Sequence, residues 1–253
     1  MTSSQAPAQR EIAHHSLLRR YLPDRRFLLT LPRAVALQIL HPAIAASFTE
    51  HVHTGLWAHK QRTVDHMIGL ACHDHPDPAR VIRYAHQHVK GRDHTGARYH
   101  ALTPNLFHFQ HATYVDTLVT AVDTYVHPLT PAARERLYQD CCDWYRLYGI
   151  STRPLLGSWP EFTEYFTDAL ATRLQRTETA DRLAAQALNP PWWALGVVPG
   201  FAVRAVQHER ATELLGITRQ PGDRMKFAAF SAALRAGARA HAPADRRPRH
   251  SPA

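Results

Sequence analysis

Apolar residues recur at intervals of three and four along almost the whole chain, and this helical spacing is the feature that most restricts the fold. Several helical segments begin at Thr-Pro pairs, Thr103-Pro104 and Thr130-Pro131, where the threonine caps the helix and the proline occupies its first turn. Others end at Gly149 or before Asn189 and two prolines. No alternating strand pattern with a hairpin turn is found. We therefore predict an all-α fold, a single irregular bundle of about eight to ten helices with a site between facing helices.

The charge is strongly positive but dispersed. The 253 residues include 30 Lys and Arg against 21 Asp and Glu, which gives a formal net charge of +9. Only the segment 245–250 is densely basic, and it lies in a proline-rich stretch at the C-terminus. We predict one helical domain over residues 1–240, a disordered basic tail over 241–253, and no nucleic-acid partner.

The cysteines and the hydropathy pattern indicate a reducing compartment and a chain without a membrane-spanning segment. Cys72, Cys141 and Cys142 are odd in number, and the adjacent pair does not close an ordinary disulfide without strain, which fits a reducing environment. The first residues lack a charged start followed by an apolar run, and no stretch of about 18 apolar residues occurs. We expect a cytoplasmic protein without a transmembrane segment.

The segment 78–91 is predicted to form one amphipathic helix that ends at Gly91. Its apolar stripe contains His86 between Ile82 and Val89, whereas Arg80 and Arg83 lie on another stripe. An imidazole inside an apolar face has to accept or donate a hydrogen bond, remain neutral, or bind a metal. His86 is therefore either a core histidine bonded to a neighbour or a ligand.

The preceding segment, 57–71, is predicted to be a helix with a polar stripe of His59, Arg62, Thr63 and His66. Solvated helix faces favour Glu, Lys and Gln, whereas two imidazoles, a guanidinium and a hydroxyl suit an anion, a propionate or an oxygen ligand. The alternative is a solvated basic face.

A long apolar helix is predicted over 31–53, with a kink or break at Pro42 and Glu50 near its end beside two histidines, His51 and His53. These three side chains are either proton donors and acceptors beside a cofactor or a solvated helix end.

Four ordered pieces of this sequence resemble the latex-clearing-protein (rubber oxygenase) and MpaB-like family. They are Leu31 to Pro42, Arg62-Thr63, the pattern His86-x-x-Val89-x-Gly91, and Gly96-x-x-Tyr99-x-Ala101-x-x-Pro104. The resemblance implies an all-helical protein that binds heme b, with His86 as the proximal iron ligand. It also implies an oxygenase or oxidase that acts on a small or hydrophobic organic substrate with dioxygen or peroxide. Arg62, Thr63 and His59 would then anchor propionates or steer dioxygen.

The sequence departs from the family at two positions. Rubber oxygenases carry a lysine before the threonine that reaches the iron, but this chain has Arg62, and a guanidinium does not bind iron. The sixth iron position should therefore hold water or an imidazole, His59 first. His59 also replaces an arginine of the family motif. A heme-binding carrier or sensor without turnover, and a cofactor-free helical interaction protein, remain alternative functions.

Overall fold

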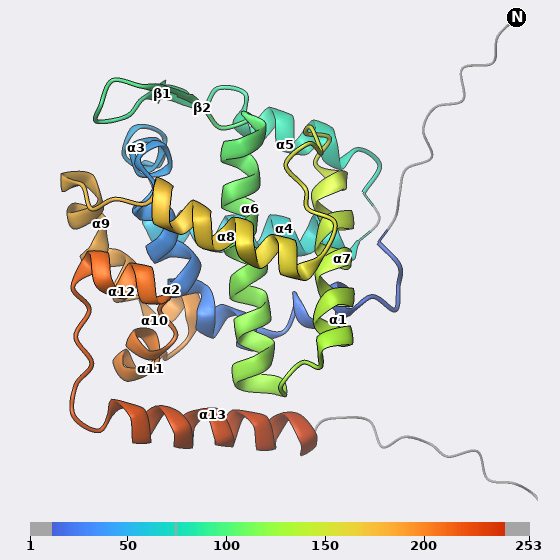
Figure 1. The fold of residues 1–253 in the computed structure, drawn as a ribbon, viewed down its shortest axis with the longest axis vertical. Coiled ribbons are helices and arrows are strands. Elements are labelled where there is room, and N and C mark those ends of the chain that lie inside the picture. The colour runs from blue at the N-terminus through green and yellow to red at the C-terminus, as the bar shows by residue number, and fades with distance from the viewer. Residues whose placement is uncertain (1–11, 74, 241–253) are drawn as a thin grey trace, which may run out of the picture.

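Residues 12–73 and 75–240 are described in the computed structural model, and they are 68% helical with 3% strand (Figure 1). The prediction of an all-α fold is confirmed. The described residues form 13 helices rather than eight to ten, because α1, α10 and α11 are short additional turns. The predicted tail, 241–253, lies outside the described residues.

The first half of the chain contains α1 (Leu17–Tyr21), α2 (Arg25–Ile39), α3 (Pro42–His51), α4 (Leu56–Cys72), α5 (Pro78–His86), β1 (Lys90–Arg92), β2 (Arg98–His100) and α6 (Pro104–Ala121). A π-helical turn, η1 (Val122–Val126), extends α6. The second half contains α7 (Pro131–Leu147), α8 (Trp159–Arg173), α9 (Glu178–Leu188), α10 (Trp192–Leu195), α11 (Gly200–Ala205), α12 (Glu209–Leu215) and α13 (Asp223–Ala240).

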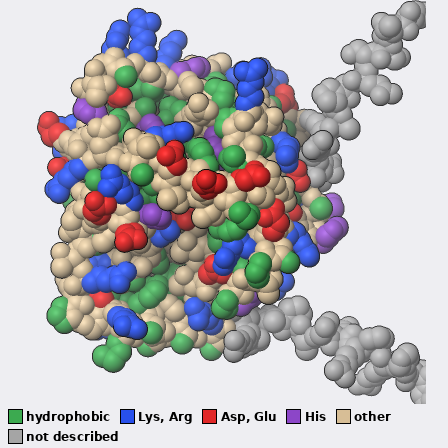
Figure 2. Space-filling model, viewed as in Figure 1, with side chains coloured by type: hydrophobic (Ala, Val, Ile, Leu, Met, Phe, Trp, Pro, Cys, Tyr) green, Lys and Arg blue, Asp and Glu red, His purple; other side chains and the backbone are tan. Residues whose placement is uncertain are grey.

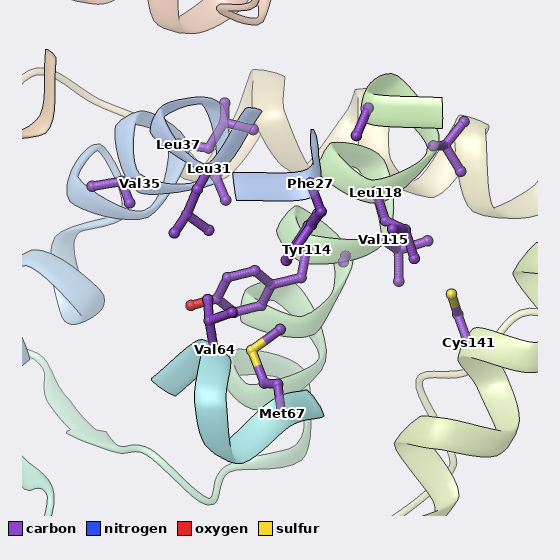
Figure 3. Packing of buried hydrophobic residues seen from close by; sticks show 14 of the residues in the cluster. Phe27, Leu31, Val35, Leu37, Val64, Met67, Tyr114, Val115, Leu118 and Cys141 are labelled. Carbon is purple, nitrogen blue, oxygen red and sulfur yellow. The ribbon is translucent and has the colours of Figure 1, made fainter. Parts of the chain in front are cut away.

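Helices α2 and α6 pack against each other at the centre of the molecule, and the other helices surround them (Figure 1). Figure 3 shows Leu31 and Val35 of α2, Val115 and Leu118 of α6, and Val64 of α4 in the buried cluster between these helices. All five side chains are almost fully buried. Their burial is the main force that holds the two central helices together, since apolar surface removed from water contributes about 25 cal/mol per Å².

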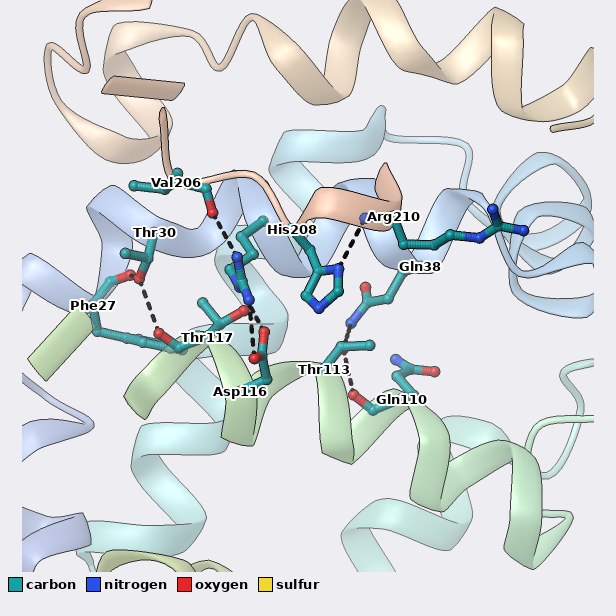
Figure 4. A network of polar contacts seen from close by, with 11 residues as sticks. Phe27, Thr30, Gln38, Gln110, Thr113, Asp116, Thr117, Val206, His208 and Arg210 are labelled. Atoms are coloured by element: carbon teal, nitrogen blue, oxygen red, sulfur yellow. Dashed lines mark hydrogen bonds and ion pairs between the residues drawn. The ribbon is translucent and has the colours of Figure 1, made fainter. Parts of the chain in front are cut away.

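Polar side chains also cross the contact between α2 and α6. Arg33 Nε donates to Asp116 Oδ2 at 2.6 Å, and its Nη1 donates to the Val206 carbonyl at 3.0 Å. Figure 4 labels the two partners, Asp116 and Val206, and draws the bonds as dashed lines. Gln38 Nε2 donates to Thr113 Oγ1 at 2.7 Å. These bonds satisfy groups that would be costly to bury alone, and they fix the register of the two helices.

The long apolar segment is split at Pro42, as predicted. Helix α2 ends at Ile39, α3 begins at Pro42, and the two helices meet at an angle of 102°. Helix α2 begins at Arg25, capped by Asp24, and not near Leu31, so Pro32 lies inside the helix rather than in its first turn. Among the described residues no single helix is long and apolar enough to cross a membrane, and only this bent pair passes that test when taken together.

The helix predicted over 78–91 is shorter than expected. Helix α5 ends at His86, and Gly91 pairs with Tyr99 in a two-stranded antiparallel hairpin. The expectation that no hairpin occurs was therefore wrong. The close approach of α3 explains the glycine, because a Cβ atom on Gly91 would lie 2.2 Å from Glu50 Oε2 and 2.8 Å from the Tyr99 hydroxyl oxygen. A Cβ atom at this position would have to displace the Glu50 carboxylate and the Tyr99 hydroxyl, and Gly91 does not cap a helix.

The apolar segment that contains α10 is largely exposed. Trp192 is 75% exposed, Trp193 48% and Val197 83%, whereas Ala194 is buried. A helix of four residues can turn only one side inward, so α10 buries its alanine and leaves both indoles outside.

On the face shown in Figure 2, Lys and Arg side chains are interspersed with Asp and Glu over the described residues.

Candidate active site

A cavity of about 1110 Å³ lies between α3, α4, α5 and α6. Much of its wall is apolar, with Phe48 from α3, Met67 and Leu70 from α4, Ile82 from α5 and Phe107 from α6. Ligand pockets in proteins usually measure about 300–1,000 Å³, so the volume of this cavity lies just above the upper end of that range.

His86 lies at the end of α5 and lines this cavity. Its Nδ1 is 2.9 Å from the carbonyl oxygen of Ile82. Since a carbonyl only accepts, Nδ1 must carry the hydrogen, and the lone pair of the neutral ring is therefore on Nε2. Burial, despite the bond to Ile82, lowers the pKa of His86 and favours this neutral form. Phe107 packs edge-on against the ring, with 5.4 Å between the two centroids.

The polar stripe of α4 lines the same cavity. His59, Arg62, Thr63 and His66 all contribute to its wall, so the structure brings them together with His86. The Thr63 hydroxyl donates to the His59 carbonyl oxygen at 2.9 Å and lies 3.5 Å from His59 Nε2. Arg62 is exposed, and its Nη2 donates to Thr54 Oγ1 at 2.6 Å in the loop before α4. The guanidinium is therefore held near the rim of the cavity.

The electrostatic surroundings keep His59 neutral. Desolvation, followed by the positive charges of Lys60 and Arg62, lowers the pKa of His59 to about 3. A neutral imidazole retains a lone pair at any pH near 7, so His59 can accept a hydrogen bond or bind a metal ion.

Glu50 does not line the cavity. Its carboxylate accepts a hydrogen bond from the Tyr99 hydroxyl of β2, and it lies 3.7 Å from Nε2 of His51. His51 does line the cavity, so Glu50 approaches it only through this neighbour. Burial, together with the nearby carboxylate, raises the pKa of Tyr99, which therefore remains a hydrogen-bond donor.

Helix α6 supplies a wall of the cavity that sequence analysis missed. Phe107, Gln110, His111 and Tyr114 lie at i, i+3, i+4 and i+7, and all four line the cavity. That spacing was a usable signal, but apolar and amide side chains at helical spacing usually form a core. His111 Nε2 lies 3.2 Å from the Cys141 carbonyl, and desolvation lowers the pKa of His111 to about 3.

A second residue that the sequence analysis overlooked is Lys60, whose side chain is fully buried behind the cavity wall. Its Nζ donates to Gln38 Oε1, lies 3.4 Å from the Tyr114 hydroxyl oxygen, and sits 4.3 Å from the centroid of the Phe48 ring. Within the described residues it has no carboxylate partner. Desolvation lowers the pKa of Lys60 to about 7. Its position between Trp57 and Val64 on the apolar side of α4 was the signal for burial.

The fold and the cavity together define an all-α protein with a large, mainly apolar cavity, and desolvation lowers the pKa of three histidines in its wall, His59, His86 and His111. The chain belongs to the family described as ER-bound oxygenase mpaB/B'/Rubber oxygenase, catalytic domain, whose model matches residues 19–236. This membership confirms the resemblance in the sequence and supports an oxygenase, and so an oxidoreductase, role. No curated protein and no solved structure matches the chain.

Proposed function

We propose that this cavity binds heme b and that the protein uses it as an oxygenase or oxidase. The substrate would be a small or hydrophobic organic molecule, oxidised with dioxygen or peroxide, and His86 would be the proximal iron ligand. The hydrogen bond from His86 Nδ1 to the Ile82 carbonyl carries this proposal, because it leaves the Nε2 lone pair available in a large, mainly apolar cavity. A backbone acceptor of this kind orients metal-binding histidines and makes them more basic.

The other features of the cavity fit heme. Among the described residues, no group of three or more His, Cys, Asp or Glu side chains is placed to hold a metal ion. Heme iron needs only one or two protein ligands, since the porphyrin supplies the others. Arg62 at the cavity rim offers a counter-charge for a propionate.

The protein's own residues would bind the heme, orient its ligands and exclude water from the cavity. His86 would hold the iron through Nε2, and heme would supply an iron centre that activates dioxygen or peroxide. Thr63 and His59 would offer a hydroxyl and a neutral imidazole to a ligand beside α4. Phe48, Met67 and their apolar neighbours would exclude water. Glu50 would exchange a proton with the cavity through His51, whose Nε2 lies 3.7 Å from the carboxylate.

The proposal is tested by measuring heme content and absorption spectra. His86→Ala should lose heme, whereas His66→Ala, which changes an exposed histidine of the same cavity, should keep it. Arg62→Ala should keep the fold but weaken heme retention or azide binding. A fully loaded His86→Ala protein with an unchanged spectrum would refute the ligand assignment.

Oxygen uptake then separates an enzyme from a carrier or sensor. The loaded protein should consume dioxygen when a reductant and an organic substrate are supplied. Stable heme binding without any uptake across a substrate panel would favour the carrier or sensor.

A further inference from the structure

The rim of the cavity is rich in arginine. Arg80 and Arg83 from α5 and Arg62 from α4 line it, and all three are exposed. Among the lining residues that the structure describes, the one carboxylate belongs to Asp77, which is engaged as the N-cap of α5 and accepts the Arg80 backbone N–H at 2.9 Å. The charge at the rim is therefore positive.

Arg80 and Arg83 differ from many arginines of this chain in having no partner. Arg33 and Arg204, for example, each form two hydrogen bonds to one carboxylate. In the described part of the chain, neither the Arg80 nor the Arg83 guanidinium has a hydrogen-bond or ion-pair partner, whereas Arg62 is bound to Thr54. Residues at i and i+3 are neighbours on a helix surface, so the two guanidinium groups can reach one anion.

Apolar residues of α5 line the cavity and are only partly covered by their neighbours. The helix separates its polar and apolar residues clearly, yet none of its residues is buried. Val81 and Ile82 line the cavity, and Tyr84, also a lining residue, is 78% exposed. An apolar surface of this kind beside unpaired cations matches a molecule with an apolar body and an anionic head.

We propose that the substrate of this site is an amphipathic organic anion, such as a carboxylate, with its head bound by Arg80 and Arg83 and its apolar body extending along α5 into the cavity. The statement that this anion is oxidised rests on the proposed function. The binding of the anion to Arg80 and Arg83 does not depend on that function. The carboxylates of heme offer the same chemistry as a substrate carboxylate. The two sources have to be separated by experiment.

The test compares octanoate with 1-octanol, which has the same alkyl chain without the charge. Calorimetry on the full-length protein, as purified and after loading with hemin, should show octanoate binding about tenfold or more tightly, since hydrogen bonds to charged groups are the strong ones. The preference should fall as salt concentration rises. The double variant Arg80→Gln and Arg83→Gln should lose the preference and keep its heme. Arg98→Gln, at an exposed arginine of β2 away from the cavity, is the control and should keep both.

Two results would overturn the inference. Equal affinity for octanoate and octanol in the native protein would show that the rim does not select anions. Loss of heme from the double variant, with the octanoate preference intact in the protein that remains loaded, would assign the two arginines to the heme propionates. If the protein takes up no heme at all, the proposed function fails, but the octanoate comparison still decides whether an anion site exists.

Discussion

Replacing Lys60 with methionine is expected to remove a pH-dependent cost to stability. The Lys60 side chain is fully buried, and within the described residues it has hydrogen-bond acceptors and ring faces around it but no carboxylate. Desolvation lowers its pKa from 10.5 to about 7. Between these two values the unfolded chain holds a proton that the folded protein has mostly released, so folding is increasingly favoured as pH rises from 7.

The magnitude follows from the two pKa values. At pH 7 the shift costs the folded state about 4 kcal/mol, and at pH 9 about 2 kcal/mol, because one pKa unit corresponds to about 1.36 kcal/mol. The contribution of Lys60 should therefore make the native protein about 2 kcal/mol more stable at pH 9 than at pH 7. Lys60→Met has a similar length and no titrating group, so this part of the pH dependence should disappear.

The assay is urea unfolding of native protein and variant at pH 7 and pH 9, followed by circular dichroism. Other groups also titrate in this range, but their effects are common to both proteins and cancel in the comparison. Lys90→Met, at an exposed lysine of β1, is the matched control and should follow the native protein. An identical change between pH 7 and pH 9 in native protein and Lys60→Met would show that Lys60 does not titrate in this window, and the reasoning would fail.

Three further substitutions test other parts of the structure, each by urea unfolding. Gly91→Ala should destabilise by about 2 kcal/mol, because its Cβ atom would displace the Glu50 carboxylate from Tyr99, and an unchanged midpoint would contradict that packing. Asp116→Asn should lower the free energy of unfolding by about 3 kcal/mol, since it leaves the Arg33 charge without its carboxylate in a largely buried site. A decrease below about 1 kcal/mol, as for an exposed ion pair, would contradict this prediction. His108 is buried, and desolvation, followed by the charge of Arg173, lowers its pKa to about 4. As pH falls from 7 to 5, the unfolded chain takes up a proton on this histidine before the folded protein does, which should lower the free energy of unfolding by about 2 kcal/mol. His108→Leu should lack this contribution to the pH dependence.

The sequence by itself determined the fold class and most helix ends. Thr130 and Ser158 cap α7 and α8 with their side chains, and α9 ends at Leu188 just before Asn189 and two prolines, as expected. These signals are local, because a cap or a proline acts on the backbone within one turn of its own position. The common face of His59, Arg62 and Thr63 was predictable for the same reason, since helical spacing alone places them on one side.

Tertiary structure decided what no local pattern contains. The hairpin after α5 depends on Gly91 approaching Glu50, a residue from another element. The contribution of α6 to the cavity depends on what the side of the helix that carries Gln110 faces. Helical spacing shows that these residues share a side, but it does not specify which helix lies opposite. Trp192 is exposed because α10 is a single turn that buries its alanine instead.

His86 and Lys60 show the physical reason for this division. Periodicity placed each residue on an apolar side, but an apolar side faces either a packed core or a cavity, and only the arrangement of neighbouring helices determines which. His86 lines the cavity with its Nδ1 bonded to Ile82, whereas Lys60 lies in the packed layer behind the cavity wall. Burial, hydrogen-bond partners and shifted pKa values come from residues distant in the chain, so they are properties of the tertiary structure.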